Sequence, residues 1–202
     1  MIHPASELRF ISAEIGHGVF ATTFIPRGTL VWVFDEFDRV LTPSHVHRLP
    51  PLLGAVVAKY GYVRADGNTV LCWDLGRYMN HACAPTSRDV GDALVVAVRD
   101  IAADDELTCD YGSLNLSEPM VCRCGAATCR GVVRGDDPLR HYERWDEEAR
   151  AAFAVSPSVP QPLLPFANVG VAELPLLDAV RNGTVAENPS ARESSIPRDG
   201  AE

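Results

Sequence analysis

Short runs of apolar residues separated by turn residues make up most of the first 131 positions of this chain. The run TLVWVF at 29–34 and the run ALVVAVRDI at 93–101 are rich in β-branched residues, which is typical of buried strands. TVLCWDL at 69–75 and DDELTCDYG at 104–112 show weaker versions of the same pattern. Residues 43–60 instead favour a loop and a short helix. The pattern predicts a mainly β domain with few short helices.

A helical period replaces the short apolar runs after residue 132. In the segment 138–153 apolar positions recur every three or four residues, at Leu139, Tyr142, Trp145 and Ala149. Four prolines in 155–165 prevent this helix from continuing. A second short helix is predicted at 173–183, ending at Gly183. The polar residues 187–202 are predicted to be disordered.

Composition and charge narrow the class of protein. Of the 202 residues, 47% are hydrophobic and 22% are charged, which is ordinary for a globular chain that buries a sizeable core. The net charge of −9 argues against a binder of nucleic-acid backbones and favours a basic partner. No apolar run approaches the ~20 residues of a membrane span, and the opening MIHPASELRF lacks the pattern of a secretory signal. We expect a cytoplasmic protein, or a nuclear one in a eukaryote, that binds neither membranes nor nucleic acid directly.

Three of the six cysteines stand close together in the segment CRCGAATC at 122–129. A structural zinc ion is held tetrahedrally by four ligands, most often thiolates and imidazoles. The tight loop supplies three thiolates, and the fourth ligand is to come from Cys72, Cys83, Cys109 or a histidine. Reactive thiols or a disulfide are the alternatives for this cluster. Because disulfides are rare in a reducing compartment, the spacing favours a metal site.

Four segments in a fixed order together resemble one family. They are GHGVFATTFIPRG at 16–28, RYMNHACAP at 77–85, DDELTCDYG at 104–112 and CRCGAATCRG at 122–131. These segments resemble the motifs of the SET-domain protein lysine methyltransferases that carry a post-SET zinc loop. The resemblance covers about residues 8–131, with no cysteine-rich region ahead of it. The chain therefore resembles a compact form of the family.

The resemblance implies a fold as well as a set of motifs. That fold is a group of small curved β-sheets in which the segment 104–112 threads beneath the segment 77–85 as a pseudoknot, an exception to the rule that chains avoid threading. The implied boundaries are 8–117 for the SET domain, 118–134 for the post-SET cysteine loop, 135–186 for a helical and proline-rich extension and 187–202 for a disordered tail.

The resemblance implies S-adenosylmethionine as the methyl donor. The residues implied to contact it are Gly16, His17, Gly18, Val19, Asn80, His81 and Tyr111. Gly16 and Gly18 allow the backbone to approach a ligand closely. Tyr111 is the implied catalytic residue, whose hydroxyl orients the substrate amine. Because a phenol has a pKa of about 10, orientation is favoured over proton abstraction at neutral pH.

The resemblance also completes the metal site. Cys83 occupies the position that supplies the fourth thiolate in the family, so the implied structural zinc ligands are Cys83, Cys122, Cys124 and Cys129. Arg77 precedes this segment, and we expect it to pair with Asp110 or Glu106 in a structural role.

The implied lysine channel includes Cys109, Trp73 and Tyr62. Relatives carry phenylalanine or tyrosine at the position of Cys109, and this position sets how many methyl groups are added. Since cysteine is much smaller than either ring, the channel is predicted to allow two or three methyl transfers. A neighbouring aromatic side chain that fills the vacated volume is the alternative.

The implied function is methyl transfer from S-adenosylmethionine to the side-chain amine of lysine in a protein substrate, expected to be basic. The alternative is a catalytically inactive SET-like module that binds peptides. The presence of Asn80, His81 and Tyr111 favours the enzyme.

Overall fold

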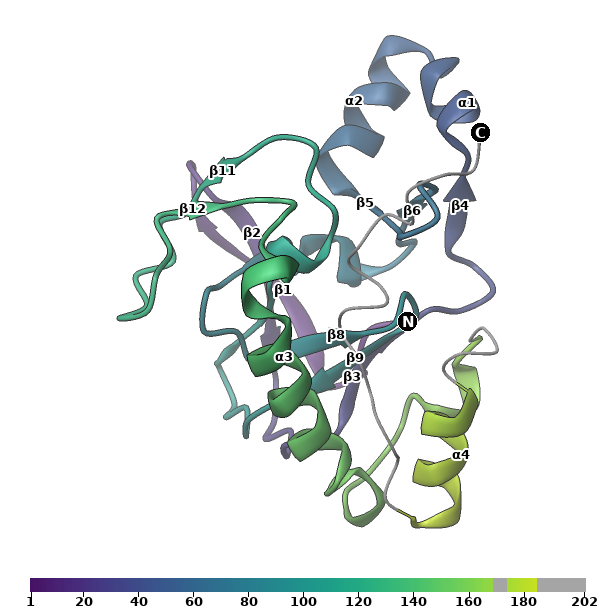
Figure 1. Ribbon diagram of the computed structural model, residues 1–202, viewed down its shortest axis with the longest axis vertical. Coiled ribbons are helices and arrows are strands. Elements are labelled where there is room, and N and C mark those ends of the chain that lie inside the picture. The colour runs from purple at the N-terminus through teal and green to yellow at the C-terminus, as the bar shows by residue number, and fades with distance from the viewer. Residues whose placement is uncertain (169–173, 185–202) are drawn as a thin grey trace.

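The computed structural model describes residues 1–168 and 174–184, so the tail predicted at 187–202 lies outside the described residues. Within this part of the chain, the strands form four small sheets of two to four strands each (Figure 1). The prediction of a mainly β fold with few short helices is confirmed. In the described ranges, each helix is too short or too polar to cross a membrane.

One sheet carries three of the four motif segments. Its strands run in the order β1 (Ser6–Ser12), β2 (Gly16–Ala21), β10 (Glu106–Cys109) and β7 (Asn80–His81). β10 pairs antiparallel with β2, where Leu107 lies opposite Val19. On its other edge β10 pairs in parallel with β7, and Cys109 lies opposite His81. Segments that are far apart in the sequence therefore lie side by side, as the expected threading requires.

The remaining strands form three smaller units. One sheet has the order β3 (Leu30–Val33), β9 (Leu94–Ala97) and β8 (Ser87–Val90), and a second has the order β4 (Arg39–Leu41), β6 (Thr69–Leu71) and β5 (Gly61–Val63). The pair β11 (Met120–Val121) and β12 (Val132–Val133) flanks the cysteine loop. Helices α1 (Pro43–His47) and α2 (Pro51–Tyr60) occupy the predicted helical segment. The 3₁₀ turn η1 (Leu75–Tyr78) leads into the motif segment 77–85, and η2 (Tyr111–Ser113) ends the motif segment 104–112.

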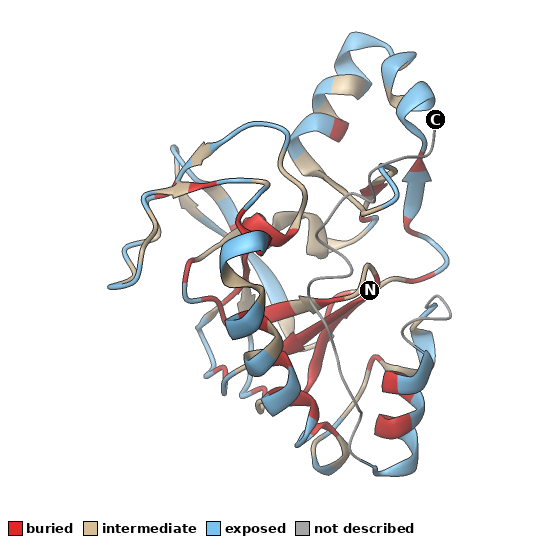
Figure 2. Ribbon diagram, viewed as in Figure 1, coloured by how far each residue is buried: buried red, intermediate tan, exposed pale blue. Residues whose placement is uncertain are grey.

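Two apolar cores share the sheet formed by β3, β9 and β8. Val31 and Val95 pack in the first core, together with Val19 and Leu107 of the four-stranded sheet. Neighbouring residues on the same strands, Leu30, Val33, Leu94 and Val96, pack in the second core. The sheet is therefore buried on both faces, as the near-continuous apolar runs predict (Figure 2).

The C-terminal extension closes the second core. Helix α3 (Pro138–Phe153) has the bounds predicted from its period, and it packs on β8 and β9 (Figure 1). Its buried face and that of α4 (Leu174–Asn182) add Ala149, Ala152, Phe153 and Leu177 to this core. Among its described residues, the proline-rich segment between the helices contains the 3₁₀ turns η3 (Ser156–Ser158) and η4 (Leu164–Phe166). The hydroxyl of Ser156 donates to the Gly28 carbonyl at 2.6 Å, which ties the extension to the turn before β3.

Candidate active site and metal site

Asn80 joins the glycine-rich segment to β10. Its Nδ2 donates to the carbonyl of His17 at 3.0 Å and to Oε1 of Glu106 at 2.7 Å. Gly18 lies so close beneath this amide that an added Cβ would stand 2.9 Å from Asn80 Nδ2. Gly16 has φ +87°, a conformation that favours glycine. The structure thus gathers the predicted residues Gly16, Gly18 and Asn80 at one place on the sheet.

His17 and Val19, on the same strand, differ sharply in exposure. The exposed His17 ring lies between two aromatic rings, with centroids 5.6 Å from Phe10 and 6.2 Å from Tyr78. Val19 is fully buried in the first core, so only its main chain is available to a ligand. The strand therefore offers a ligand the His17 ring and the main chain of its neighbours.

His81 uses its ring for contacts within the protein. Its Nδ1 accepts a hydrogen bond from the Tyr111 N–H at 3.1 Å, and its Nε2 lies 3.3 Å from Cys83 Sγ. The side chain is 5% exposed, and burial lowers the pKa of His81. The imidazole thus connects the Tyr111 turn to the cysteine group, and the main chain of His81 is the part left for a ligand.

Tyr111 begins the turn η2, one residue after β10 ends. Its hydroxyl donates to the Met79 carbonyl at 2.8 Å, which fixes the direction of the phenol. Burial is the main cause that raises the pKa of Tyr111 above its ordinary value of 10. The phenol therefore stays protonated at neutral pH, which suits an orienting role and makes it a poor base.

A cavity of about 550 Å³ lies beside Tyr111. It is bounded by α2 and β5 on one side and by the segment 113–120 on another. Its wall includes Trp32, Tyr62, Cys109 and Tyr111. Tyr62 is held in place because its hydroxyl donates to the Asp92 carbonyl at 3.1 Å. Two of the three predicted channel residues, Cys109 and Tyr62, are therefore brought together with Tyr111.

Trp73, the third predicted channel residue, does not line this cavity. Its indole Nε1 donates to Asp35 Oδ2 at 2.9 Å, and its ring lies 5.6 Å from that of Phe37. Trp73 is 46% exposed. A polar partner at the surface thus holds Trp73 away from the cavity.

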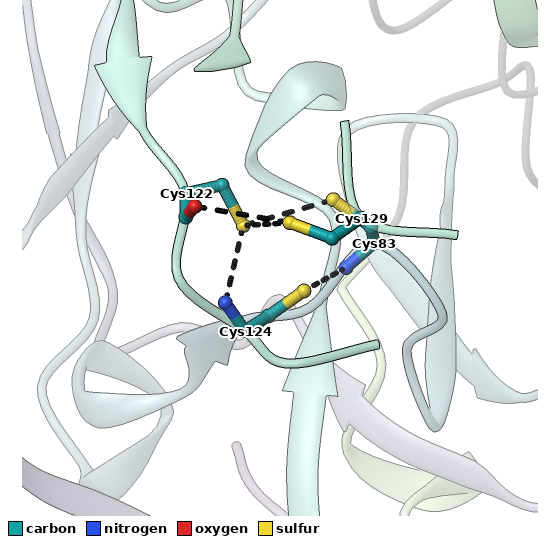
Figure 3. A group of neighbouring side chains, drawn as sticks. All are labelled: Cys83, Cys122, Cys124 and Cys129. Atoms are coloured by element: carbon teal, nitrogen blue, oxygen red, sulfur yellow. Dashed lines mark hydrogen bonds between the residues drawn. The ribbon is translucent and has the colours of Figure 1, made fainter. Parts of the chain in front are cut away.

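The four predicted zinc ligands form one group (Figure 3). Their sulfur atoms all lie within 4.8 Å of one another, and Cys122 Sγ is 3.7 Å from Cys83 Sγ and 3.6 Å from Cys129 Sγ. In a tetrahedral thiolate site with zinc–sulfur distances of about 2.3 Å, neighbouring sulfurs are about 3.8 Å apart. The group therefore fits a zinc ion, and Gly125, with φ +71°, lets the loop turn around it.

The thiol chemistry also suits a metal. Burial raises the pKa of Cys124, but hydrogen bonds from the Cys83 and Ala126 N–H groups outweigh burial and lower it to about 7. A thiol that loses its proton readily is a good metal ligand. Cys72 and Cys109, which the sequence left open as the fourth ligand, line the cavity instead.

The predicted ion pair of Arg77 with Asp110 or Glu106 is wrong. Arg77 donates to main-chain carbonyls of its own turn, those of Trp73 and, at 3.1 Å, Asp74. Asp110 is instead held by two arginines that the sequence did not single out, Arg88 and Arg130.

Asp110 is fully buried, and burial alone would raise its pKa. Hydrogen bonds and charges from Arg130 and Arg88 outweigh burial and lower the pKa of Asp110 below its ordinary value. Arg130 and Asp110 stand in two of the motif segments, so both charged residues can be seen in the sequence. Their pairing depends on the tertiary fold.

Small sheets, a parallel β10–β7 pair and four gathered thiols beside a cavity agree with the fold and the cysteine loop that the motifs imply. The family model described as "SET domain" matches residues 16–112. This chain contains a SET domain.

Curated proteins similar to this chain are named histone-lysine N-methyltransferases. Histone-lysine N-methyltransferase ATX2 of Arabidopsis thaliana is 39% identical over 131 residues, which is 58% of this chain and 12% of that protein. The H3 lysine-4 specific histone-lysine N-methyltransferase of Chaetomium globosum is 30% identical over 138 residues, which is 60% of this chain and 12% of that protein. The chain therefore spans only a small part of the length of these relatives.

A solved structure that aligns with this chain is the methyltransferase domain of human histone-lysine N-methyltransferase SETMAR. It aligns with a TM-score of 0.47 and 21% identity, over 66% of this chain and 58% of that one.

Proposed function

We propose that this chain transfers a methyl group from S-adenosylmethionine to the side-chain amine of a lysine in a protein substrate. The observation that carries the proposal is that Tyr111 and Cys109 line one cavity directly beside the strand of Asn80 and His81. The SET domain at 16–112 and the names of the curated relatives support lysine as the methyl acceptor.

S-adenosylmethionine, when bound, supplies a methyl group activated by the adjoining sulfonium. We assign its binding to the main chain of residues 16–19 and of His81, with the His17 ring as an exposed stacking surface. Asn80 shapes this site because its amide already holds the His17 carbonyl at 3.0 Å. In this arrangement the ligand would rest on the buried strand at Gly18 and Val19, and the exposed His17 ring would border its solvent side.

Tyr111 orients the lysine amine in this proposal. Since its hydroxyl donates to Met79 at 2.8 Å, its lone pairs stay free to accept a hydrogen bond from the amine. The apolar wall of the cavity, including Trp32 and Tyr62, disfavours the charged ammonium and promotes loss of its proton before transfer. Holding the amine and the methyl group in line is then the main catalytic task.

The four cysteines would hold a structural zinc ion. Cys83 follows His81 by two residues, whereas the other three ligands come from the loop between β11 and β12. A bound metal would therefore hold this loop against the strand that borders the active site. A closed four-thiolate shell would leave no open position for substrate, so the metal would act through structure.

The substrate class follows from charge and family. A net charge of −9 favours a basic protein such as a histone over nucleic acid. We place the protein in the cytoplasm, or in the nucleus of a eukaryotic cell.

The test is methyl transfer by the purified full chain, with added zinc and isotope-labelled S-adenosylmethionine, to a panel of basic peptides and histones. We expect label on lysine, and none on peptides in which each lysine is replaced by arginine. The alternative, an inactive SET-like peptide-binding module, predicts peptide binding without transfer. Binding of the labelled donor and of peptides, with no methylation of any of them, would therefore contradict the proposal.

A further inference from the structure

A buried group of charges joins the Tyr111 turn to helix α3, which lies outside the matched SET domain. Asp110, the residue before Tyr111, is fully buried. Its carboxylate accepts hydrogen bonds from Arg88 Nη1 at 2.9 Å and from Arg130 Nη1 at 3.1 Å. Arg88 is itself 2% exposed. The carboxylate of Asp110 is stabilised in its charged form at this depth by its two guanidinium partners.

Helix α3 supplies the outer side of this group. Glu148 accepts a hydrogen bond from Arg88 Nε at 2.6 Å. The Trp145 ring lies against both guanidinium groups, with its centroid 5.1 Å from Arg88 Cζ and 5.8 Å from Arg130 Cζ. Such contacts of a cation with an aromatic ring are attractive, above all where water is excluded.

The ring of Trp145, not its polar atom, makes these contacts. Trp145 is 1% exposed, and within the described residues its indole N–H has no hydrogen-bond partner. Apolar packing alone does not require two guanidinium groups against the ring. The arrangement instead indicates that Trp145 restricts two long, flexible side chains to one geometry.

Each arginine leads to a different part of the site. Arg130 follows Cys129 directly, and its N–H donates to Cys83 Sγ at 3.3 Å, so it belongs to the cysteine loop. Arg88 belongs to β8, which lies beside β10. Both arginines contact the carboxylate of Asp110. The next residue, Tyr111, donates its N–H to His81 Nδ1.

We propose that α3 is a positioning element of the methyl-transfer site, in which Trp145 and Glu148 hold Arg88 and Arg130 on Asp110 and thereby fix the Tyr111 turn relative to the cysteine loop. The effect on turnover rests on the proposed function. The ordering of the two segments does not, since it follows from the contacts alone.

The test compares Glu148→Gln with Glu147→Gln in the full chain with zinc. Both changes remove one negative charge from the same helix, but Glu147 is exposed and has no contact with the arginines among the described residues. Hydrogen exchange followed by mass spectrometry reports on the N–H groups of residues 111–113 and 130–131. We expect exchange there to be about threefold faster or more in Glu148→Gln, because a hydrogen bond between two charged groups becomes a weaker one from a charged donor to a neutral amide. Glu147→Gln should match the wild type.

A second pair, Trp145→Phe and Trp145→Leu, separates the ring contact from packing. Both remove volume from the core, but only phenylalanine keeps an aromatic face for the arginines. We expect the phenylalanine variant to retain slow exchange at 111–113 and the wild-type kcat within about threefold, and the leucine variant to lose both by about tenfold. The KM for peptide should change little in both variants, because Trp145 does not line the cavity.

Equal exchange in Glu148→Gln and Glu147→Gln, or equal kcat in Trp145→Phe and Trp145→Leu, would overturn the positioning role. If the wild type methylates no protein, the proposed function fails, and the exchange data still decide whether α3 orders the two segments.

Discussion

The hydroxyl of Tyr111 is the atom on which the proposed chemistry depends most directly. Tyr111→Phe removes this oxygen and leaves the ring in place against His81, whose centroid is 5.6 Å away. The Met79 carbonyl then loses the donor that stands at 2.8 Å. The change is therefore confined to one hydrogen bond and one potential contact with the substrate.

The two expected effects differ in size. Loss of a single neutral hydrogen bond costs about 1 kcal/mol of unfolding free energy, and domains of this kind have about 5–15 kcal/mol in total. The variant should thus remain almost entirely folded at 25 °C. Loss of substrate orientation is expected to lower kcat about 100-fold, equivalent to about 2.7 kcal/mol in the barrier. A drop of that size cannot come from unfolding.

The assay measures kcat with saturating donor and a lysine peptide, alongside the urea midpoint. Tyr62→Phe is the matched control, because Tyr62 also lies in the cavity wall and donates its hydroxyl to a carbonyl, that of Asp92 at 3.1 Å. We expect it to lose a similar amount of stability, but less than about fivefold in kcat. Wild-type turnover in Tyr111→Phe, or equal losses in the two variants, would refute the assigned role.

Three further outcomes are expected. Metal analysis should find about one zinc ion per wild-type chain and none in Cys124→Ser, whose hydroxyl is a poor replacement for a thiolate; a folded, metal-free wild type with a disulfide in the group would contradict this. Mass spectrometry of a peptide product should show wild type passing beyond monomethyl lysine and Cys109→Tyr stopping earlier, because Cys109 lines the cavity and tyrosine would fill part of it. Burial raises the pKa of Asp89 from 3.8 to about 6, so the unfolded chain ionises first and stability falls as pH rises from about 4 to 6. In Asp89→Asn this fall should be absent, so the variant should become more stable than the wild type by at most ~3 kcal/mol, a difference that stays constant at higher pH. The measurement is the urea midpoint of both proteins across this pH range. Midpoints that do not diverge would mean that the carboxyl titrates normally.

Features encoded locally were predictable from the sequence. Strands such as β3 and β9 are continuous apolar runs, and α3 was predicted from its period and opening proline with the bounds the structure has. The cysteine loop was also visible, because three of its four ligands are close in sequence.

Partner choice at a distance was not predictable from the residues alone. Arg77 was expected to reach a carboxylate, but its short 3₁₀ turn places two backbone carbonyls within its reach. Trp73 was expected near the channel, but Asp35 holds its indole at the surface. Asp110 meets Arg88 and Arg130 only because three separate segments converge, which no local pattern encodes.

The second core determines how much of this chain can exist alone in solution. Leu30, Val33, Leu94 and Val96 are covered by side chains that α3 and α4 contribute, and these helices lie beyond the end of the cysteine loop. A chain shortened after residue 134 would expose this face of the sheet to water, and large apolar patches of that kind cause proteins to associate. We therefore expect the smallest soluble and cooperatively folding unit to extend at least to Leu177, well past the boundary that the SET motifs suggest.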